Sequence, residues 1–154
     1  MRHLVFGVLV ACASLIGAKV SRRAPKRPWY RALRKAPWNP PPKVFGIVWP
    51  VLYALMAVSG ARAWKRRDRA AVALWGAQLG FNAAWSPLFF GAHRSRAALV
   101  DLGLTFASAS AYTARVARTD KAAAVMMSPY LAWLAFAATL NGAIVAKNPR
   151  LLAG

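Results

Sequence analysis

The sequence has few acids, histidines and cysteines. Its 154 residues include only three Asp or Glu, two His and one Cys, which is Cys12. A single cysteine excludes a disulfide within the chain and a zinc site built from several cysteines. Catalytic triads, metal clusters and paired carboxylates all need more of these side chains than the chain contains. We therefore expect no metal site and no acid–base catalytic centre.

Cations and apolar residues, by contrast, are abundant. The chain has 22 Lys and Arg, a formal net charge of +19, seven Trp and 58% hydrophobic residues. Such a charge is typical of nucleic-acid-binding proteins, but here the cations gather at the ends of apolar stretches instead of forming a stripe along one element. This distribution argues against nucleic acid and favours lipid phosphates as the partners of these cations.

Five stretches contain almost no charge, at residues 4–18, 44–61, 70–91, 97–114 and 122–146. A helix needs about 20 residues to cross a bilayer, and four of the stretches have that length. The pattern predicts an all-α membrane protein. The first stretch is short, and its composition also fits a cleavable signal peptide, so the sequence pattern alone leaves four or five spans open.

The segment between the first two stretches is rich in proline and aromatic residues. Prolines at positions 37 and 40–42 disfavour a regular helix. Trp29, Tyr30 and Trp38 are of the residue types that settle at the membrane–water interface. We expect a stiff loop on the bilayer surface.

Aromatic and amide side chains recur at helical spacing in three of the apolar stretches. Amides in hydrocarbon need partners, so they should face the bundle interior, where aromatics would line a cavity for a flat ligand. The alternative is that both kinds of side chain only hold the helices together. The three stripes are Phe45, Trp49, Tyr53, Met56 and Gly60; Gln78, Asn82, Trp85 and Phe89; and Tyr130, Trp133, Ala137 and Asn141.

Two ionisable residues stand outside these stripes. Asp101 is the only acid inside an apolar stretch, which makes it a functional candidate. We favour a structural role, in which it pairs with Arg96 or reaches the interface. His93 is a weak candidate for an axial haem ligand because it lies among cations in a short loop.

Five motifs follow one another along the chain: WY at 29–30, PWNPP at 37–41, VFGIVWPVLYALM at 44–56, AQLGFNAAWSPLFFGA at 77–92 and PYLAWLAFAATLN at 129–141. Together they resemble the translocator protein family, also known as tryptophan-rich sensory proteins and formerly as the peripheral-type benzodiazepine receptor. Members of that family have five transmembrane helices. The resemblance therefore implies that the first helix is retained, and that residues 1–154 form one domain with spans at 4–20, 44–63, 70–91, 97–117 and 122–146 and a surface loop at 21–43.

The resemblance also implies a ligand. Family members bind tetrapyrroles such as protoporphyrin IX and haem in a pocket beneath the first loop, and no further cofactor is expected. We expect a tetrapyrrole sensor, carrier or scavenger, with Tyr30 in the lid of the pocket. With the stripes, the predicted ligand-binding residues are Tyr30, Trp49, Tyr53, Asn82, Trp85, Trp133, Ala137 and Asn141.

Two other functions stay open. Bacterial relatives have been linked to light-dependent porphyrin breakdown, which would make Trp49 and Trp133 the reactive residues. A sterol or lipid transporter is the third hypothesis, although Gly142 stands where the sterol motif of animal members has an aromatic residue. Family members form homodimers, and we expect a bacterial inner membrane, with the mitochondrial outer membrane as the alternative.

Overall fold

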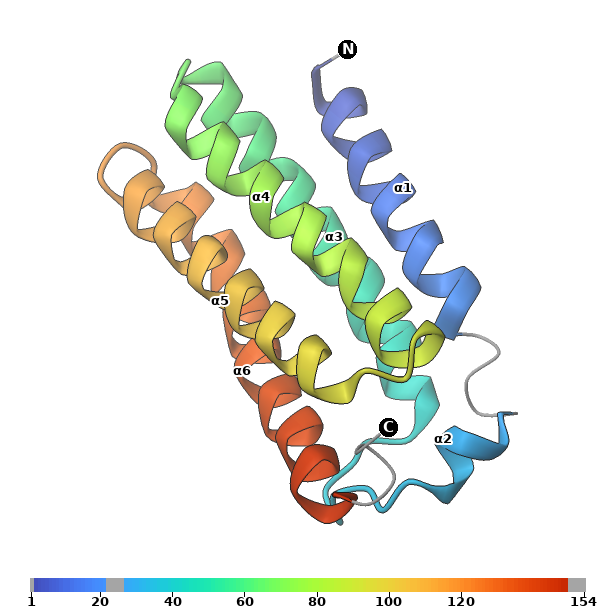
Figure 1. Cartoon of the computed structure of the whole chain (residues 1–154). Coiled ribbons are helices and arrows are strands. Elements are labelled where there is room, and N and C mark those ends of the chain that lie inside the picture. Colours follow the sequence, from blue (N-terminus) through green and yellow to red (C-terminus); the bar gives the residue numbers. More distant parts are fainter. Residues whose placement is uncertain (1, 22–26, 150–154) are drawn as a thin grey trace.

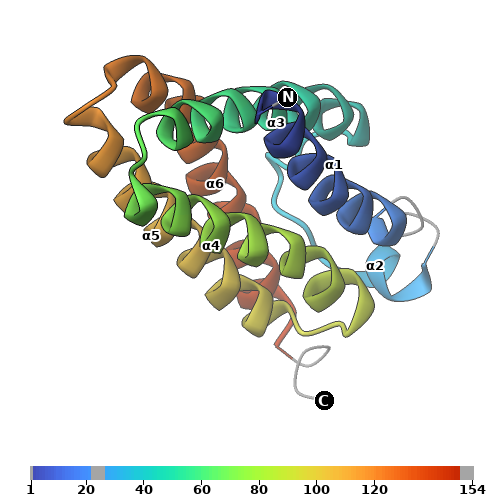
Figure 2. The same ribbon diagram turned by 90° about the horizontal axis from the view of Figure 1, so that it is seen from above.

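A computed structural model describes residues 2–21 and 27–149, with the side chains of 2–4, 14, 16–18 and 20 left out. The described residues form helices and no strand (Figure 1). Seen from above, α1 flanks α3 on one side of the molecule, and α5 lies next to α4 and α6 on the other (Figure 2). The helices are α1 (Arg2–Ser21), α2 (Pro28–Ala32), α3 (Pro42–Lys65), α4 (Arg69–Ser86), α5 (Ser95–Ala117) and α6 (Lys121–Lys147), with a π-helical turn, η2 (Pro87–Gly91), extending α4.

An aspartate caps the start of α4 and another caps the start of α6. The Asp68 carboxylate accepts the backbone N–H of Ala71 at 3.0 Å, and the Asp120 carboxylate accepts that of Ala123 at 3.1 Å. A capping side chain satisfies one of the backbone donors that a helix leaves unpaired at its first turn. Two of the three acids in the chain therefore mark where helices begin.

Each capping aspartate is also held by an arginine. The Arg62 guanidinium binds both carboxylate oxygens of Asp120 at 2.9 Å, and Arg115 Nε contacts those of Asp68 at 2.8 and 2.9 Å. The pKa of Asp120 is lowered mainly by its hydrogen bond from Arg62. The pKa of Asp68 is lowered mainly by the Ala71 N–H and then by Arg115. Both carboxylates are therefore committed to structural roles.

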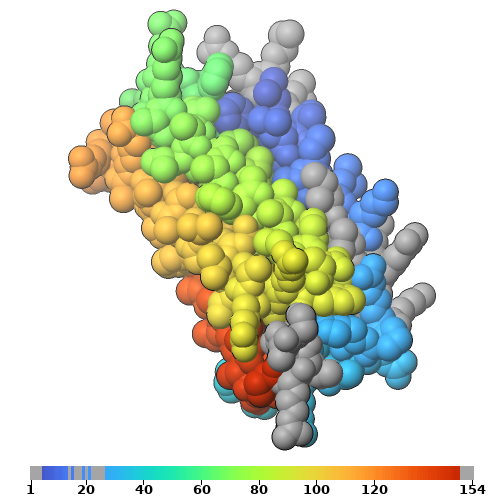
Figure 3. Space-filling view, in the orientation of Figure 1, coloured from blue at the N-terminus to red at the C-terminus, as the bar shows by residue number. Residues whose placement is uncertain are grey.

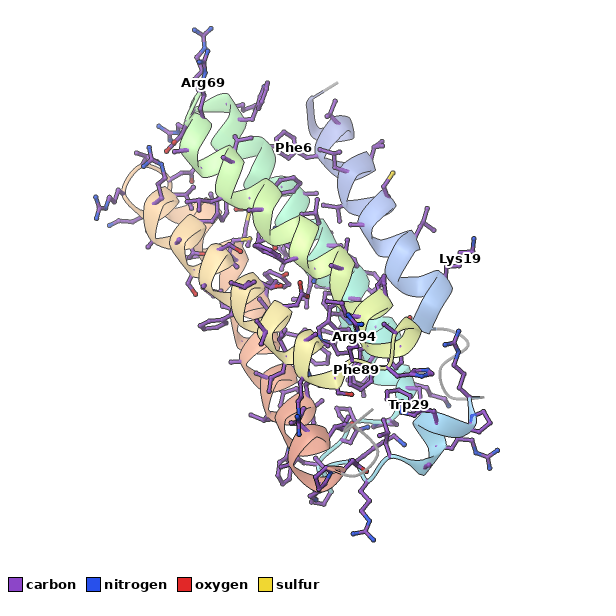
Figure 4. The ribbon with its side chains drawn as sticks, in the orientation of Figure 1. Phe6, Lys19, Trp29, Arg69, Phe89 and Arg94 are labelled. Carbon is purple, nitrogen blue, oxygen red and sulfur yellow. The ribbon has the colours of Figure 1, made fainter. Side chains whose placement is uncertain are left out.

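The first helix packs into the core. Phe6 is 5% exposed, and its ring meets the edge of Trp75 at a centroid distance of 4.8 Å (Figure 4). Trp75 is fixed from α3, because its Nε1 donates to the Met56 carbonyl at 2.9 Å. At Gly60 an added Cβ would stand 2.6 Å from the Trp75 ring, so only glycine lets the two helices come this close. The first helix, α1, is therefore part of the helical bundle.

By length and hydropathy alone, two helices of the described chain, α3 and α6, are long and apolar enough to cross a membrane. In α4 and α5 the average hydropathy is lowered by polar side chains on the inward faces, such as Gln78, Asp101 and Thr105, which are 0%, 7% and 1% exposed. Polar residues hidden inside a bundle do not meet the hydrocarbon. The hydropathy of a helix therefore understates how apolar its outer surface is.

Candidate functional site

A lid segment, residues 27–41, lies across the end of the bundle where α3 begins and α6 ends (Figure 1). Leu33 and Ala36 are its buried anchors, at 4% and 6% exposure. Arg27 ties it to the end of α4, since Nη1 donates to the Phe90 carbonyl at 2.6 Å. In the space-filling view the segment, in light blue, packs against the neighbouring helices (Figure 3).

Asn148, just after α6, clamps the lid segment. Its Oδ1 accepts the backbone N–H of Arg34 at 2.8 Å, and its Nδ2 donates to the Arg34 carbonyl at 3.0 Å and to the Ile144 carbonyl at 2.8 Å. The side chain is 4% exposed, so these bonds are shielded from water. One amide thus joins the lid segment to the last helix.

A lid cluster of aromatic rings, consisting of Trp29, Tyr30, Phe89 and Phe90, forms the underside of the lid. Trp29 meets Phe89 edge-on at a centroid distance of 5.8 Å (Figure 4). Tyr30 meets Phe90 at 5.4 Å. Burial raises the pKa of Tyr30. His93 is exposed, and its ring stacks on that of Trp29 at a centroid distance of 4.2 Å. The histidine therefore packs against the lid segment and supports it.

An inner aromatic cluster, consisting of Trp49, Tyr53, Tyr130 and Trp133, lies deeper between α3 and α6. Trp49 is at its centre, with ring centroids 5.1 Å from Tyr53, 6.5 Å from Tyr130 and 6.4 Å from Trp133. The contacts to Tyr130 and Trp133 are edge-to-face, an arrangement that aromatic quadrupoles favour. The α3 and α6 stripes therefore meet.

Asn82 connects this cluster to α4. Its Oδ1 accepts the Tyr53 hydroxyl at 3.1 Å, and its Nδ2 donates to the Tyr130 hydroxyl at 3.1 Å. The amide was predicted to contact a ligand, and in the structure its bonds hold three helices together. An amide has two acceptor lone pairs and two donor hydrogens, so one of each stays free.

Trp85 extends the lid cluster toward the larger hydrophobic core. It stacks on Phe89 at 4.9 Å with an interplanar angle of 10°, and it packs against both hydrophobic cores. Of the other predicted residues, Ala137 packs against the larger core, and Asn141 is 2% exposed. Tyr30 contacts Phe90 and not the inner aromatic cluster.

Tyr130 is not among the predicted ligand-binding residues, although it belongs to the inner aromatic cluster. Its hydroxyl bonds Asn82, and its ring contacts Trp49. The signal was present, because Tyr130 stands three residues before Trp133 on the same helical face. Phe90 and Asn148 gave no comparable signal, because their partners in the lid segment, Tyr30 and Arg34, lie far away in the sequence.

An apolar groove of about 600 Å³ opens on the outer face between α3 and α6. Trp133 is the one predicted ligand residue that lines it, so this indole borders both the groove and the inner aromatic cluster. The groove is lined by Ile47, Val48, Val51, Leu52, Pro129, Ala132, Trp133 and Phe136.

The predicted pairing of Asp101 with Arg96 is wrong. Among the described residues Asp101 forms no ion pair, whereas Asp68 and Asp120 do. Arg96 is exposed, and Asp101 is 7% exposed, so the carboxyl neither meets the arginine nor reaches the surface. The only acid inside a long helix is therefore buried without a cation.

Comparison with known proteins assigns this arrangement to a family. Residues 5–146 match the family model described as TspO/MBR family. The chain belongs to the TspO/MBR family. It is accordingly an integral membrane protein with the five-transmembrane-helix fold of that family, in which α1, α3, α4 with η2, α5 and α6 are the five long elements.

Relatives occur in animals and bacteria. The chain is 37% identical over 142 residues to the translocator protein of Bos taurus, covering 88% of this chain and 83% of the relative. It is 41% identical over 126 residues to the human translocator protein, covering 78% and 75%. It is 37% identical over 136 residues to the tryptophan-rich sensory protein of Cereibacter sphaeroides, covering 86% and 84%.

Proposed function

We propose that the protein binds a tetrapyrrole, protoporphyrin IX or haem, and acts as its sensor, carrier or scavenger. The observation that carries this proposal is the inner aromatic cluster, in which Trp49 contacts three other rings beneath a clamped lid. Ring faces and edges in an apolar setting suit a flat, largely apolar ligand. In the proposed complex Tyr30, Trp49, Tyr53, Trp85 and Trp133 stack on or border the macrocycle.

The proposed ligand also accounts for part of the positive charge of the chain. Protoporphyrin carries two propionates, and the lid segment presents Arg31 and Arg34, both exposed, and Lys35. Lys35 Nζ lies 4.3 Å from the centroid of the Tyr30 ring, at the edge of the lid cluster. Arginine pairs with carboxylates through two hydrogen bonds, so these cations would hold the propionates at the membrane surface.

A second candidate is an enzyme that oxidises porphyrin with light and oxygen. Two indoles 6.4 Å apart, Trp49 and Trp133, favour it, because an excited porphyrin held against this pair would have two electron donors close to its ring. In this case dioxygen is the oxidant, and the macrocycle is consumed. Both candidate functions include porphyrin binding, but only the enzyme consumes the bound porphyrin.

We also propose that the protein resides in a bacterial inner membrane and forms a homodimer. The basic ends of the helices suit an anionic surface, as in a bacterial inner membrane, with the mitochondrial outer membrane as the alternative. Gly76, Ala77 and Gly80 form an exposed strip of small residues on α4, where a second copy can approach closely to form a homodimer. Sedimentation in detergent distinguishes one copy from two.

Titration of the detergent-solubilised chain with protoporphyrin IX tests the binding proposal. We expect saturable quenching of tryptophan fluorescence at micromolar ligand in the dark, which corresponds to about 8 kcal/mol of binding free energy. Illumination in air should leave the porphyrin absorbance unchanged for a binder and bleach it for an enzyme. Quenching that rises linearly without saturation contradicts both candidates.

A further inference from the structure

Among the described residues, five side chains have buried polar atoms without hydrogen-bond partners: Gln78, Trp85, Ser95, Asp101 and Asn141. Three of them, Trp85 on α4, Asp101 on α5 and Asn141 on α6, form what we call the polar triad. Trp85 Nε1, Asp101 Oδ2 and both amide atoms of Asn141 are buried without a partner among the described residues. Buried polar groups in native proteins are nearly always paired, so each of these atoms calls for an occupant.

One buried cluster joins the ends of the three helices that carry the triad. It includes Phe89 in η2, the turn that extends α4, Ala98 at the start of α5 and Ile144 at the end of α6. They are 2%, 0% and 5% exposed. The same cluster includes Leu33 of the lid segment, so it lies at the end of the bundle that the lid segment covers. This contact fixes both the depth and the facing sides of the helices.

Each member of the triad stands one helical turn inward from this contact. Trp85 precedes its anchor by four residues, Asp101 follows its anchor by three and Asn141 precedes its anchor by three. Spacings of three and four residues keep a side chain on the same helical face, and one turn advances about 5.4 Å along the axis. The three polar groups therefore lie at the same depth on inward faces of adjoining helices.

Two other buried polar groups along α5 do have partners. The Thr105 hydroxyl donates to the Asp101 carbonyl at 2.8 Å, and the Tyr112 hydroxyl bonds that of Ser59 at 2.8 Å. The Ser95 hydroxyl, in the first turn of α5, has no partner among the described residues. The lack of partners is thus a property of particular positions on this helix and not of every buried polar residue. An intramembrane acid without a cation is by default a functional candidate.

The chemistry of the triad defines what would complete it. The indole N–H of Trp85 can only donate, the Asp101 carboxylate can only accept, and the Asn141 amide does both. One small group that accepts a hydrogen bond and donates another would satisfy the indole and the carboxylate together. A hydroxyl does both through a single oxygen, and it fits a site whose polar atoms are already closed off from solvent.

We propose that the polar triad is a ligand subsite that takes a hydroxyl group at the edge of the flat ligand. The inference rests on the proposed function, because Trp85 also belongs to the aromatic wall that the ligand would meet. The ligand's O–H donates to Asp101, and its oxygen accepts from Trp85 or Asn141. A ligand with a hydroxyl group forms these hydrogen bonds with the triad, and a ligand without it does not.

Uncharged porphyrins test this subsite without the lid cations. Haematoporphyrin dimethyl ester carries two hydroxyethyl groups where protoporphyrin dimethyl ester carries two vinyl groups, and both esters lack free carboxylates. We expect the hydroxylated ester to bind the wild type about tenfold more tightly, the effect of one or two buried hydrogen bonds. Asp101→Ala and Asn141→Ala should each reduce this preference to about twofold or less.

Thr105→Ala is the matched control. It removes a buried hydroxyl one turn along α5 that already has its own partner, so the preference should stay at its wild-type value. The two triad variants are made separately, so that either decides the outcome if the other fails to fold. The free acids haematoporphyrin and protoporphyrin IX are titrated in parallel.

The outcomes separate this inference from the proposed function. A preference for the hydroxylated ligands in the wild type that the triad variants lose supports the subsite. Saturable binding of all the porphyrins with no hydroxyl preference, or with one that both triad variants retain, overturns the subsite and leaves tetrapyrrole binding in place; the triad then holds water only. No saturable binding of any porphyrin overturns both.

Discussion

Replacing Trp49 and Trp133 together by leucine is expected to weaken protoporphyrin IX binding at least 100-fold. The two indoles contact each other edge-to-face, with Trp49 also against Tyr53 and Tyr130. Stacking of a flat aromatic ligand on a side-chain ring contributes about 1–3 kcal/mol per ring, so the loss of two rings corresponds to about 3 kcal/mol or more. The measurement is equilibrium titration followed by porphyrin absorbance.

A second tryptophan pair controls for a general loss of indoles. Trp38 and Trp64 are 55% and 50% exposed and lie outside the inner aromatic cluster. Trp38→Leu/Trp64→Leu should change the affinity by less than about threefold. Equal weakening in both double variants would show that the porphyrin binds the surface non-specifically, and the pocket proposal would then be wrong.

The variant Asn148→Ala is expected to release the lid segment. It removes the three hydrogen bonds that join Arg34 and Ile144 through one buried amide. Each is worth about 0.5–1.5 kcal/mol, so local opening should become about 10- to 100-fold more frequent. Hydrogen–deuterium exchange at the Arg34 amide reports this directly. Faster dissociation of bound porphyrin should accompany it, because the lid would open without unfolding the bundle.

Asn39→Ala is the control for the lid. The Asn39 side chain bonds only the adjacent Pro40 carbonyl at 3.1 Å, so its loss leaves the clamp intact. We expect exchange at Arg34 and porphyrin dissociation to stay within about twofold of the wild type. If Asn148→Ala raised exchange throughout α6 as strongly as in the lid segment, Asn148 would be a general stability residue.

Helical spacing predicted which faces meet but not which atoms would pair. The stripes containing Trp49, Asn82 and Trp133 do converge, because a polar or aromatic side chain in a membrane helix seeks the interior. The sequence could not show that the Asn82 side chain would form hydrogen bonds with two tyrosine hydroxyls from other helices. Such pairing depends on the rotation of each helix in the bundle, to within a few tens of degrees.

The error at Asp101 has a simple geometric cause. Arg96 precedes it by five residues, which at about 100° per residue places the two side chains roughly 140° apart around the helix. The two residues are close in sequence but lie on different sides of the helix, with Arg96 exposed and Asp101 buried. Helical angles, applied to this pair as they were to the stripes, would have predicted an unpaired acid.

The lid segment was only partly predictable. Its prolines correctly indicated irregular backbone, and residues 33–41 contain no helix. The short helix α2 was missed, although Pro28 at its first position is a common start signal. The Asn148 clamp joins residues 114 positions apart, and no local pattern encodes a contact of that separation.

The most direct test of the account is circular dichroism in the Soret band of protoporphyrin IX added to the chain in the dark. Free porphyrin is achiral and gives no signal, so a signal arises only when the protein holds the macrocycle in a fixed orientation. We predict a saturable Soret signal with the wild type and with Trp38→Leu/Trp64→Leu, and none with Trp49→Leu/Trp133→Leu. The account would be contradicted by a flat spectrum with the wild type at saturating ligand, or by an undiminished signal with the Trp49/Trp133 double variant.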